Sequence, residues 1–425
     1  MKKTIIATSI SFILLAGGAI AATQLADQHL AQIYQSQANI GLLNNFQVHK
    51  KDLGFWGGEA EWRANIALDP CATAPEQSIE IIAKDSIRKS LMGYNIKTTF
   101  QFNHLDPKIA QLLNQQLTAE TQIKWTGKGS TKLILAPYLF SEEPMSIEWK
   151  QPITASFDFK YQDQQLKARN LAIKADQLAI QQPNETVEFT NIRYSSNLPL
   201  HINDLETGKW ALHIKAIDIQ SKAESSKAFI EKFSLNMAQH IRPEKSNLEM
   251  LFDINKAHFH TPEYEHFIAN EFQVRLSLLD LDTSAIQKMT NILHQASQEC
   301  SQPEQVFTHL EQPILELLQK GFKVESNRNQ LKLGFGELVA NGEMTIPARA
   351  YTDFETAKNE LAEQVQYRAT VNFNKLFFKN LLEFTSPEYQ KDKDKIEQRW
   401  KELAQEKNVT LTDDKFVYEV KQNMP

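Results

Sequence analysis

Apolar and polar residues alternate along most of the chain. The alternation is clearest over residues 60–68, 95–103 and 145–194. In an extended strand successive side chains point to opposite faces, so this pattern predicts half-buried β-strands. Turn-forming residues such as Gln162-Asp163 and Pro183-Asn184 separate the runs. Since parallel strands need long crossovers, we expect an antiparallel meander. The pattern continues over residues 212–214, 217–219, 235–237, 252–254 and 272–281.

Three predicted helices interrupt these strands, over residues 106–117, 301–320 and 386–407. Each opens with a polar residue shortly before a proline, an arrangement typical of a helix start. Two further helices are predicted over residues 283–298 and 374–383.

A strand–turn–strand unit follows each of the three proline-opened helices. These units cover residues 121–135, 322–335 with a turn at 327–329, and 409–420 with a turn at 413–414. We interpret them as a recurring helix-plus-hairpin module at irregular intervals. Unrelated amphipathic helices would look the same, and this alternative stays open. The fold class that we expect is α+β, mainly β, with extended antiparallel meander sheets.

The N-terminus reads as a signal peptide or a transmembrane anchor. A short positive segment, Met1-Lys2-Lys3, precedes an uncharged run over residues 4–22 that contains the possible cleavage site Ala19-Ile20-Ala21. The run is close to the length that spans a bilayer as a helix. Both interpretations place the rest of the chain outside the cytoplasm. We therefore expect three regions: residues 1–22 as signal or anchor, 23–225 as a β-rich region with one helix, and 226–425 as a β-rich region with three to four helices.

Composition narrows the class of protein. The chain has 425 residues, of which 42% are hydrophobic and 23% charged, so a buried core can form. The net charge is −6, which argues against a nucleic-acid binder. The two cysteines, Cys71 and Cys300, are far apart in sequence. A disulfide between them and two separate thiols are both compatible with the sequence.

Few residue patterns suggest a metal site. His258 and His260 share one face of a predicted strand, and Glu263, Glu265 and His266 follow closely. However, Thr261-Pro262 ends that strand at once, and exposed histidines explain the pattern better. We predict no metal site.

No other sequence motif gives a clear signal for a nucleotide-binding or catalytic site. The sequence Gly127-Lys128-Gly129-Ser130 lacks the spacing of a P-loop, and Gly334-Phe335-Gly336 lacks the third glycine of a dinucleotide fingerprint. Glu142-Glu143 and Asp413-Asp414 accompany turn signals, which favours a role as turn residues over general acid–base catalysis. We predict no catalytic residue, no cofactor and no enzymatic activity.

Two stretches carry a resemblance to a known family. Residues 46–68 (FQVHKKDLGFWGGEAEWRANIAL) combine a strand, the turn Gly54-Phe55-Trp56-Gly57 and an alternating strand. Residues 313–348 combine a helix end, Lys320-Gly321, a strand, a turn, a strand and Asn341-Gly342. In these features the chain resembles the YdgA/YihF-like family, the bacterial domain of unknown function 945. The resemblance implies a Gram-negative periplasmic or inner-membrane-anchored protein of unassigned activity, and it implies no catalytic residue.

The aromatic content suggests how such a protein could act. The chain has 24 Phe against 14 Gly, and many Phe occupy alternating positions, so the sheets have broad apolar faces. The predicted helices are few compared with the strands whose apolar faces they would have to cover. Either the sheet folds on itself and buries these faces, or part of a face stays open and binds an acyl chain or an envelope component. We expect a non-enzymatic binding protein for lipid or an envelope component. The alternative is a periplasmic scaffold that oligomerises through strand edges.

Overall fold

The computed structural model describes most of the chain beyond residue 42. The described residues are 43–54, 56–67, 78–90, 93–124, 126–162, 165–199, 205–262, 267–299, 301–385, 393–403, 409–412 and 414–422. The predicted leader over residues 1–22 lies outside them, as do Cys71, Cys300 and the cluster Glu263, Glu265 and His266.

The described chain is mainly β, as predicted, and it divides into two compact units. Unit 1 comprises residues 1–178, 193–204 and 294–302, and unit 2 comprises residues 179–192, 205–293 and 303–425. Two strands have residues in both units, β10 (Gln165–Gln181) and β11 (Glu185–Ser196).

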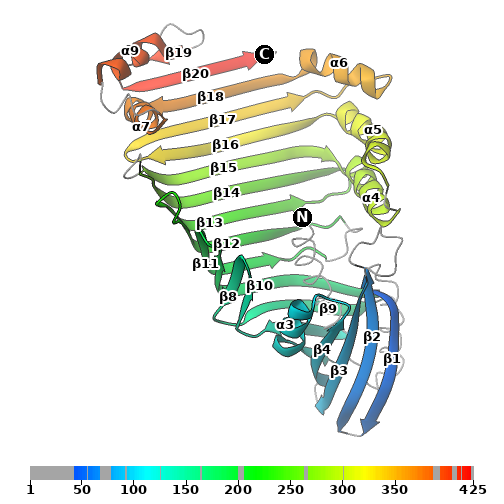
Figure 1. Cartoon of the computed structure of the whole chain (residues 1–425). Coiled ribbons are helices and arrows are strands. Elements are labelled where there is room, and N and C mark those ends of the chain that lie inside the picture. The colour runs from blue at the N-terminus through cyan, green and yellow to red at the C-terminus, as the bar shows by residue number, and fades with distance from the viewer. Residues whose placement is uncertain are drawn as a thin grey trace. The chain divides into compact units, whose positions relative to one another are not determined.

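Unit 1 is built on an antiparallel sheet that follows chain order with one insertion. Its strands pair in the order β1-β2-β3-β4-β5-β6-β9-β10, and the hairpin β7–β8 is inserted between β6 and β9 (Figure 1). The elements are β1 (Leu43–Gly54), β2 (Gly57–Ala67), β3 (Ser78–Ser90), β4 (Gly93–Asn103), α3 (Pro107–Gln116), β5 (Leu117–Lys124), β6 (Lys128–Leu135), β7 (Tyr138–Glu142), β8 (Met145–Trp149) and β9 (Ile153–Gln162).

The alternating apolar residues of unit 1 form a buried core. Inward-facing residues of β2 to β6 form one cluster, in which Trp62, Ile81, Phe100 and Leu133 are at most 5% exposed. Helix α3 packs on this face of the sheet and contributes Leu113 to the core. Its start is fixed by Asp106, whose carboxylate accepts a hydrogen bond from the backbone N–H of Lys108 at 3.0 Å.

Unit 2 contains a second antiparallel meander. Its strands pair in the order β12-β13-β14-β15-β16-β17-β18-β20, and β19 pairs with β20. The strands are β12 (Gly208–Ser221), β13 (Ser226–His240), β14 (Lys245–His260), β15 (Phe267–Asp282), β16 (Phe322–Leu333), β17 (Gly336–Ile346), β18 (Gln366–Asn374), β19 (Val409–Leu411) and β20 (Lys415–Gln422). The helices are α4 (Thr283–Glu299), α5 (Pro303–Lys320), α6 (Phe354–Gln364), α7 (Lys375–Thr385) and α9 (Lys393–Leu403).

The helices of unit 2 pack at the ends of the strands. At one end, Leu315 and Leu318 of α5 and Ala357 of α6 form a cluster with Ile346 of β17. At the other end, α7 and α9 pack around Phe416 of β20. The cluster residues from these helices are Phe378, Ile396 and Trp400. Figure 1 shows the two groups of helices on opposite sides of the central strands.

Most of the predicted elements are confirmed. The helices predicted over residues 106–117, 283–298, 301–320 and 374–383 are α3, α4, α5 and α7, and α9 lies within the helix predicted over residues 386–407. The first and third predicted hairpins are β5–β6 and β19–β20. Helix α6 escaped prediction, although Asp353 caps it by accepting a hydrogen bond from the backbone N–H of Thr356 at 2.7 Å.

One prediction about a strand was wrong. The turn predicted at residues 327–329 lies inside the continuous strand β16, because a β-bulge there resembles a turn in sequence. Residues 212–214 and 217–219, where the alternation predicts strand, both belong to β12.

Candidate functional site

Eight apolar side chains of unit 2 form one surface on β12 to β15. Leu212, Leu235, Phe252 and Val274 lie directly opposite one another across the four strands. A second row beside it contains Ile214, Phe233, Ile254 and Phe272. Directly opposite residues of paired strands share a face, so these two rows form a continuous surface, which we call the apolar face.

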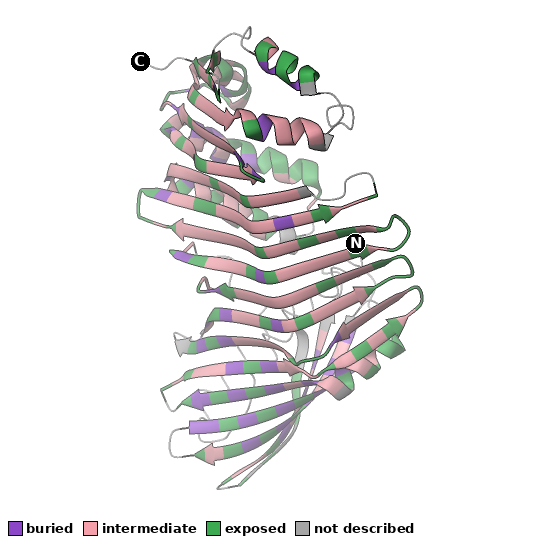
Figure 2. Cartoon of the chain, turned by 90° about the vertical axis from the view of Figure 1, so that its left-hand side faces the viewer, coloured by how far each residue is buried: buried purple, intermediate pink, exposed green. Residues whose placement is uncertain are grey.

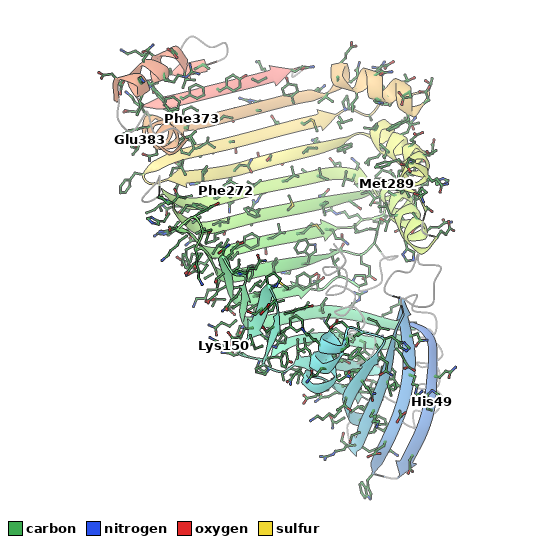
Figure 3. All side chains as sticks on the ribbon, viewed as in Figure 1. His49, Lys150, Phe272, Met289, Phe373 and Glu383 are labelled. Atoms are coloured by element: carbon green, nitrogen blue, oxygen red, sulfur yellow. The ribbon has the colours of Figure 1, made fainter. Side chains whose placement is uncertain are left out.

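Contacts between aromatic rings join the two rows. The ring centroids of Phe233 and Phe252 are 5.3 Å apart, and those of Phe252 and Phe272 are 5.5 Å apart. Both pairs are edge-to-face, the arrangement that the ring quadrupoles favour. Figure 3 shows Phe272 on the central strands, with Met289 of α4 towards one end and Glu383 of α7 towards the other.

β-Bulges keep apolar residues on this face where the strands bend. In β16, Val324 and Leu331 are an odd number of residues apart, yet they oppose Met344 and Leu338 of β17. Met344 and Leu338 are an even number apart and share a face, so Val324 and Leu331 share it as well. The extra residue is absorbed near Arg328, which has a φ of 60°.

A positive φ recurs in β13 and β15, where Lys232 and Glu271 have φ values of 53° and 50°. The pairing of β15 with β16 shifts register beside Glu271, whereas β13 keeps its register with both of its neighbours. At each of these positions the spacing between apolar residues changes from two to three, as from Ile230 to Phe233. Figure 2 shows the strands bending part-way along their length. The changed spacing therefore continues the apolar side of the sheet beyond the bend.

The apolar face is only partly buried. Of its eight residues only Ile214, at 9% exposure, is buried, and the neighbouring Met250 is 37% exposed. In unit 1 the same kind of alternation buries Trp62 completely. The reason is packing: α5 packs on β15 and α7 on β16 to β18, and no described helix makes comparable contact with β12, β13 or β14. Figure 2 shows the central strands largely in the intermediate class.

The opposite side of these strands is polar. Asn236, Asp253 and Gln273 occupy positions between the apolar residues and therefore point the other way. Partial burial, with the nearby carboxylate of Glu271 as a second cause, raises the pKa of Asp253. Glu271 itself forms an ion pair with Lys332. The sheet is therefore amphipathic, with one polar side and one apolar side.

The histidines singled out from the sequence lie elsewhere, near the ends of β13 and β14. His258 and His260 line a shallow pocket of about 330 Å³ together with Asp218, Lys227 and Phe229. The rings of His258 and Phe229 are 6.4 Å apart. Within the described part of the chain no three metal-binding side chains come together.

The other motifs considered in the sequence analysis lie in turns or at the ends of strands. Of Gly127-Lys128-Gly129-Ser130, Gly127 lies in the turn of the β5–β6 hairpin and the other three residues begin β6. Gly334-Phe335 forms the turn between β16 and β17. Glu142-Glu143 lies at the end of β7 and the turn that follows, and Asp414 lies between β19 and β20.

Sequence comparison places the chain in a family. Among the described residues no helix is long and apolar enough to cross a membrane. Comparison with curated proteins and with solved structures gives no match. The model of the family described as bacterial protein of unknown function (DUF945) matches residues 1–421. The chain therefore belongs to the DUF945 family of bacterial proteins of unknown function.

Proposed function

We propose that the protein is a non-enzymatic binding protein of the bacterial envelope that holds the acyl chain of a lipid on its apolar face. The observation that carries this proposal is the partly exposed double row on β12 to β15. Water contact with such a surface is unfavourable, and each CH₂ group that an occupant buries contributes about 0.8 kcal/mol. The occupant is therefore expected to be apolar.

The chemistry of the surface favours an acyl chain. The two rows contain only aliphatic and aromatic side chains, and the polar residues of the same strands point to the other side. A hydrocarbon chain needs no hydrogen-bond partner, so it can lie across the strands without leaving a polar group unsatisfied.

An envelope location is the second part of the proposal. It rests on the positive segment and the uncharged run over residues 4–22, which are typical of a signal peptide or an inner-membrane anchor. The mass of the intact protein recovered from cell membranes and periplasm decides between cleavage and retention. Recovery of the full-length chain from the cytosol would contradict this location.

Lipid extraction tests the binding proposal. Full-length protein purified without added lipid should release acyl species, detected by mass spectrometry. In Leu235→Asp a charge enters the centre of the apolar face, so the bound lipid should fall by roughly tenfold. Asn236→Asp is the matched control, because it adds the same charge to the adjacent position on the polar side. An absence of acyl species, combined with no uptake of a fluorescent fatty acid, would refute the proposal.

A periplasmic scaffold is the second candidate function. Strand β19 pairs with only Phe416 to Tyr418 of β20, and no described strand pairs with the remainder of that edge. Such an edge offers backbone hydrogen bonds to another chain.

A further inference from the structure

A pocket lined with cations lies on the outer side of the unit 1 sheet. It has a volume of about 700 Å³ and is formed where the β5–β6 and β9–β10 hairpins lie side by side. Its cationic lining residues are Lys124, Lys128, Lys160, Lys167 and Arg169, and among the described lining residues Asp158 is the one carboxylate. This local excess of positive charge contrasts with the net charge of −6 of the chain.

The lysines form a row across the sheet. Lys128 lies directly opposite Lys160, which in turn lies directly opposite Lys167 on the next strand. Lys124 ends the neighbouring strand β5, one residue beyond the pair Ile123 and Gly129. Neighbouring strands are about 4.8 Å apart, so the row extends over roughly 14 Å. Such a row of ammonium groups attracts multiply charged anions.

A β-bulge adds two polar residues to the same pocket. The register of β9 and β10 shifts between Arg169 and Ala172, and Asn170 has a φ of 56°. Ala168 and Leu171 on either side are buried, whereas Arg169 and Asn170 are both exposed. The amide of Asn170 donates a hydrogen bond to Asp158 at 2.9 Å.

We propose that this pocket binds a multiply charged phosphate group, either a free phosphorylated solute or a phospholipid headgroup. Lysine ammonium groups act as point charges for phosphate, and the arginine guanidinium can bind two phosphate oxygens at once. The hydroxyl of Ser130 and the amide of Gln122 also line the pocket and supply neutral donors. The site lies wholly within unit 1 and does not depend on the function proposed for the apolar face of unit 2.

Calorimetric titration of the full chain with inorganic pyrophosphate tests the site. The pocket variant carries Lys128→Gln, Lys160→Gln and Lys167→Gln. The control carries Lys84→Gln, Lys97→Gln and Lys132→Gln, three exposed lysines of the same unit that do not line the pocket. We expect the affinity for pyrophosphate to fall at least about tenfold in the pocket variant and to stay within about twofold in the control. The Tm of each variant, compared with that of the wild-type protein, shows that the variant is folded.

A lipid arm identifies the source of the phosphate. Soluble short-chain phosphatidylglycerol that competes with pyrophosphate supports a headgroup site, and binding of pyrophosphate alone supports a free solute. Equal affinity of the wild-type and pocket variants would overturn the proposal, as would citrate binding as tightly as pyrophosphate. Leu235→Asp should leave pyrophosphate binding unchanged, so this site and the lipid-binding function can fail independently.

Discussion

Asp85 is a carboxyl group placed inside the apolar core of unit 1. It accepts hydrogen bonds from the Thr98 hydroxyl at 2.6 Å and from the Trp62 indole N–H at 3.1 Å. Burial raises the pKa of Asp85 to about 7, although both hydrogen bonds act in the opposite direction. The folded protein therefore holds a proton at pH values where the unfolded chain, with an ordinary carboxyl pKa near 3.8, has released it.

This difference makes stability depend on pH. Between about pH 4 and pH 7 the folded state binds more protons, so the free energy of unfolding should fall as the pH rises. One pKa unit corresponds to about 1.4 kcal/mol, so the loss is on the order of 4 kcal/mol. Asparagine cannot ionise, so the Asp85→Asn variant should not show this loss of stability as the pH rises. Urea unfolding followed by tryptophan fluorescence at several pH values measures it, and parallel curves for the two proteins would contradict the assignment.

At the scale of elements, the alternation of apolar and polar residues predicted the strands correctly wherever they are regular. It located the strands around Trp62 and Phe100, and prolines located the starts of α3 and α5. It failed at the bulge in β16, where the polar residues 326–330 have the composition of a turn. Only tertiary contacts show that the strand continues: Asn329 accepts a hydrogen bond from the backbone N–H of Arg275 at 2.9 Å, and Asn341 accepts one from that of Arg328 at 2.7 Å.

The two candidate sites differ in how far the sequence could predict them. The apolar positions of β12 to β15 are visible in the sequence, but whether helices cover them depends on packing. The row Lys128, Lys160 and Lys167 requires the pairing of β6 with β9, a non-sequential pair that alternation does not reveal. Each lysine lies close to a hairpin turn, where charged residues are common, so the sequence carries no distinct signal for the pocket.

The bulge in β16 supports a prediction about its backbone. Arg328 has a φ of 60°, a conformation that asparagine tolerates and that is costly for a β-branched residue. Arg328→Val should therefore lower the free energy of unfolding by about 1–3 kcal/mol. Arg328→Asn should change it by less than about 0.5 kcal/mol, since the side chain is exposed. Urea unfolding of both variants measures the effect, and equal stability would show that the bulge adopts another conformation.

At the scale of the whole molecule, the alternating apolar residues are buried in unit 1 but partly exposed in unit 2. Unit 1 closes its apolar side with α3 and buries residues such as Trp62 and Phe157 almost completely. Unit 2 places its helices at the strand ends and leaves Phe252 and its neighbours partly exposed. A partly exposed apolar surface of this kind is typical of a binding or self-association site.

Stripping the occupant should therefore promote self-association. In light scattering, the delipidated full-length protein should form larger species as its concentration rises, and added fatty acid should reverse this. Phe252→Lys should suppress the association, because a charge on the apolar face would have to be buried in the contact. Gln273→Lys adds the same charge to the polar side and serves as the control. Association that persists unchanged in Phe252→Lys and is insensitive to fatty acid would instead favour pairing through the free edge of β20, and thus the scaffold function.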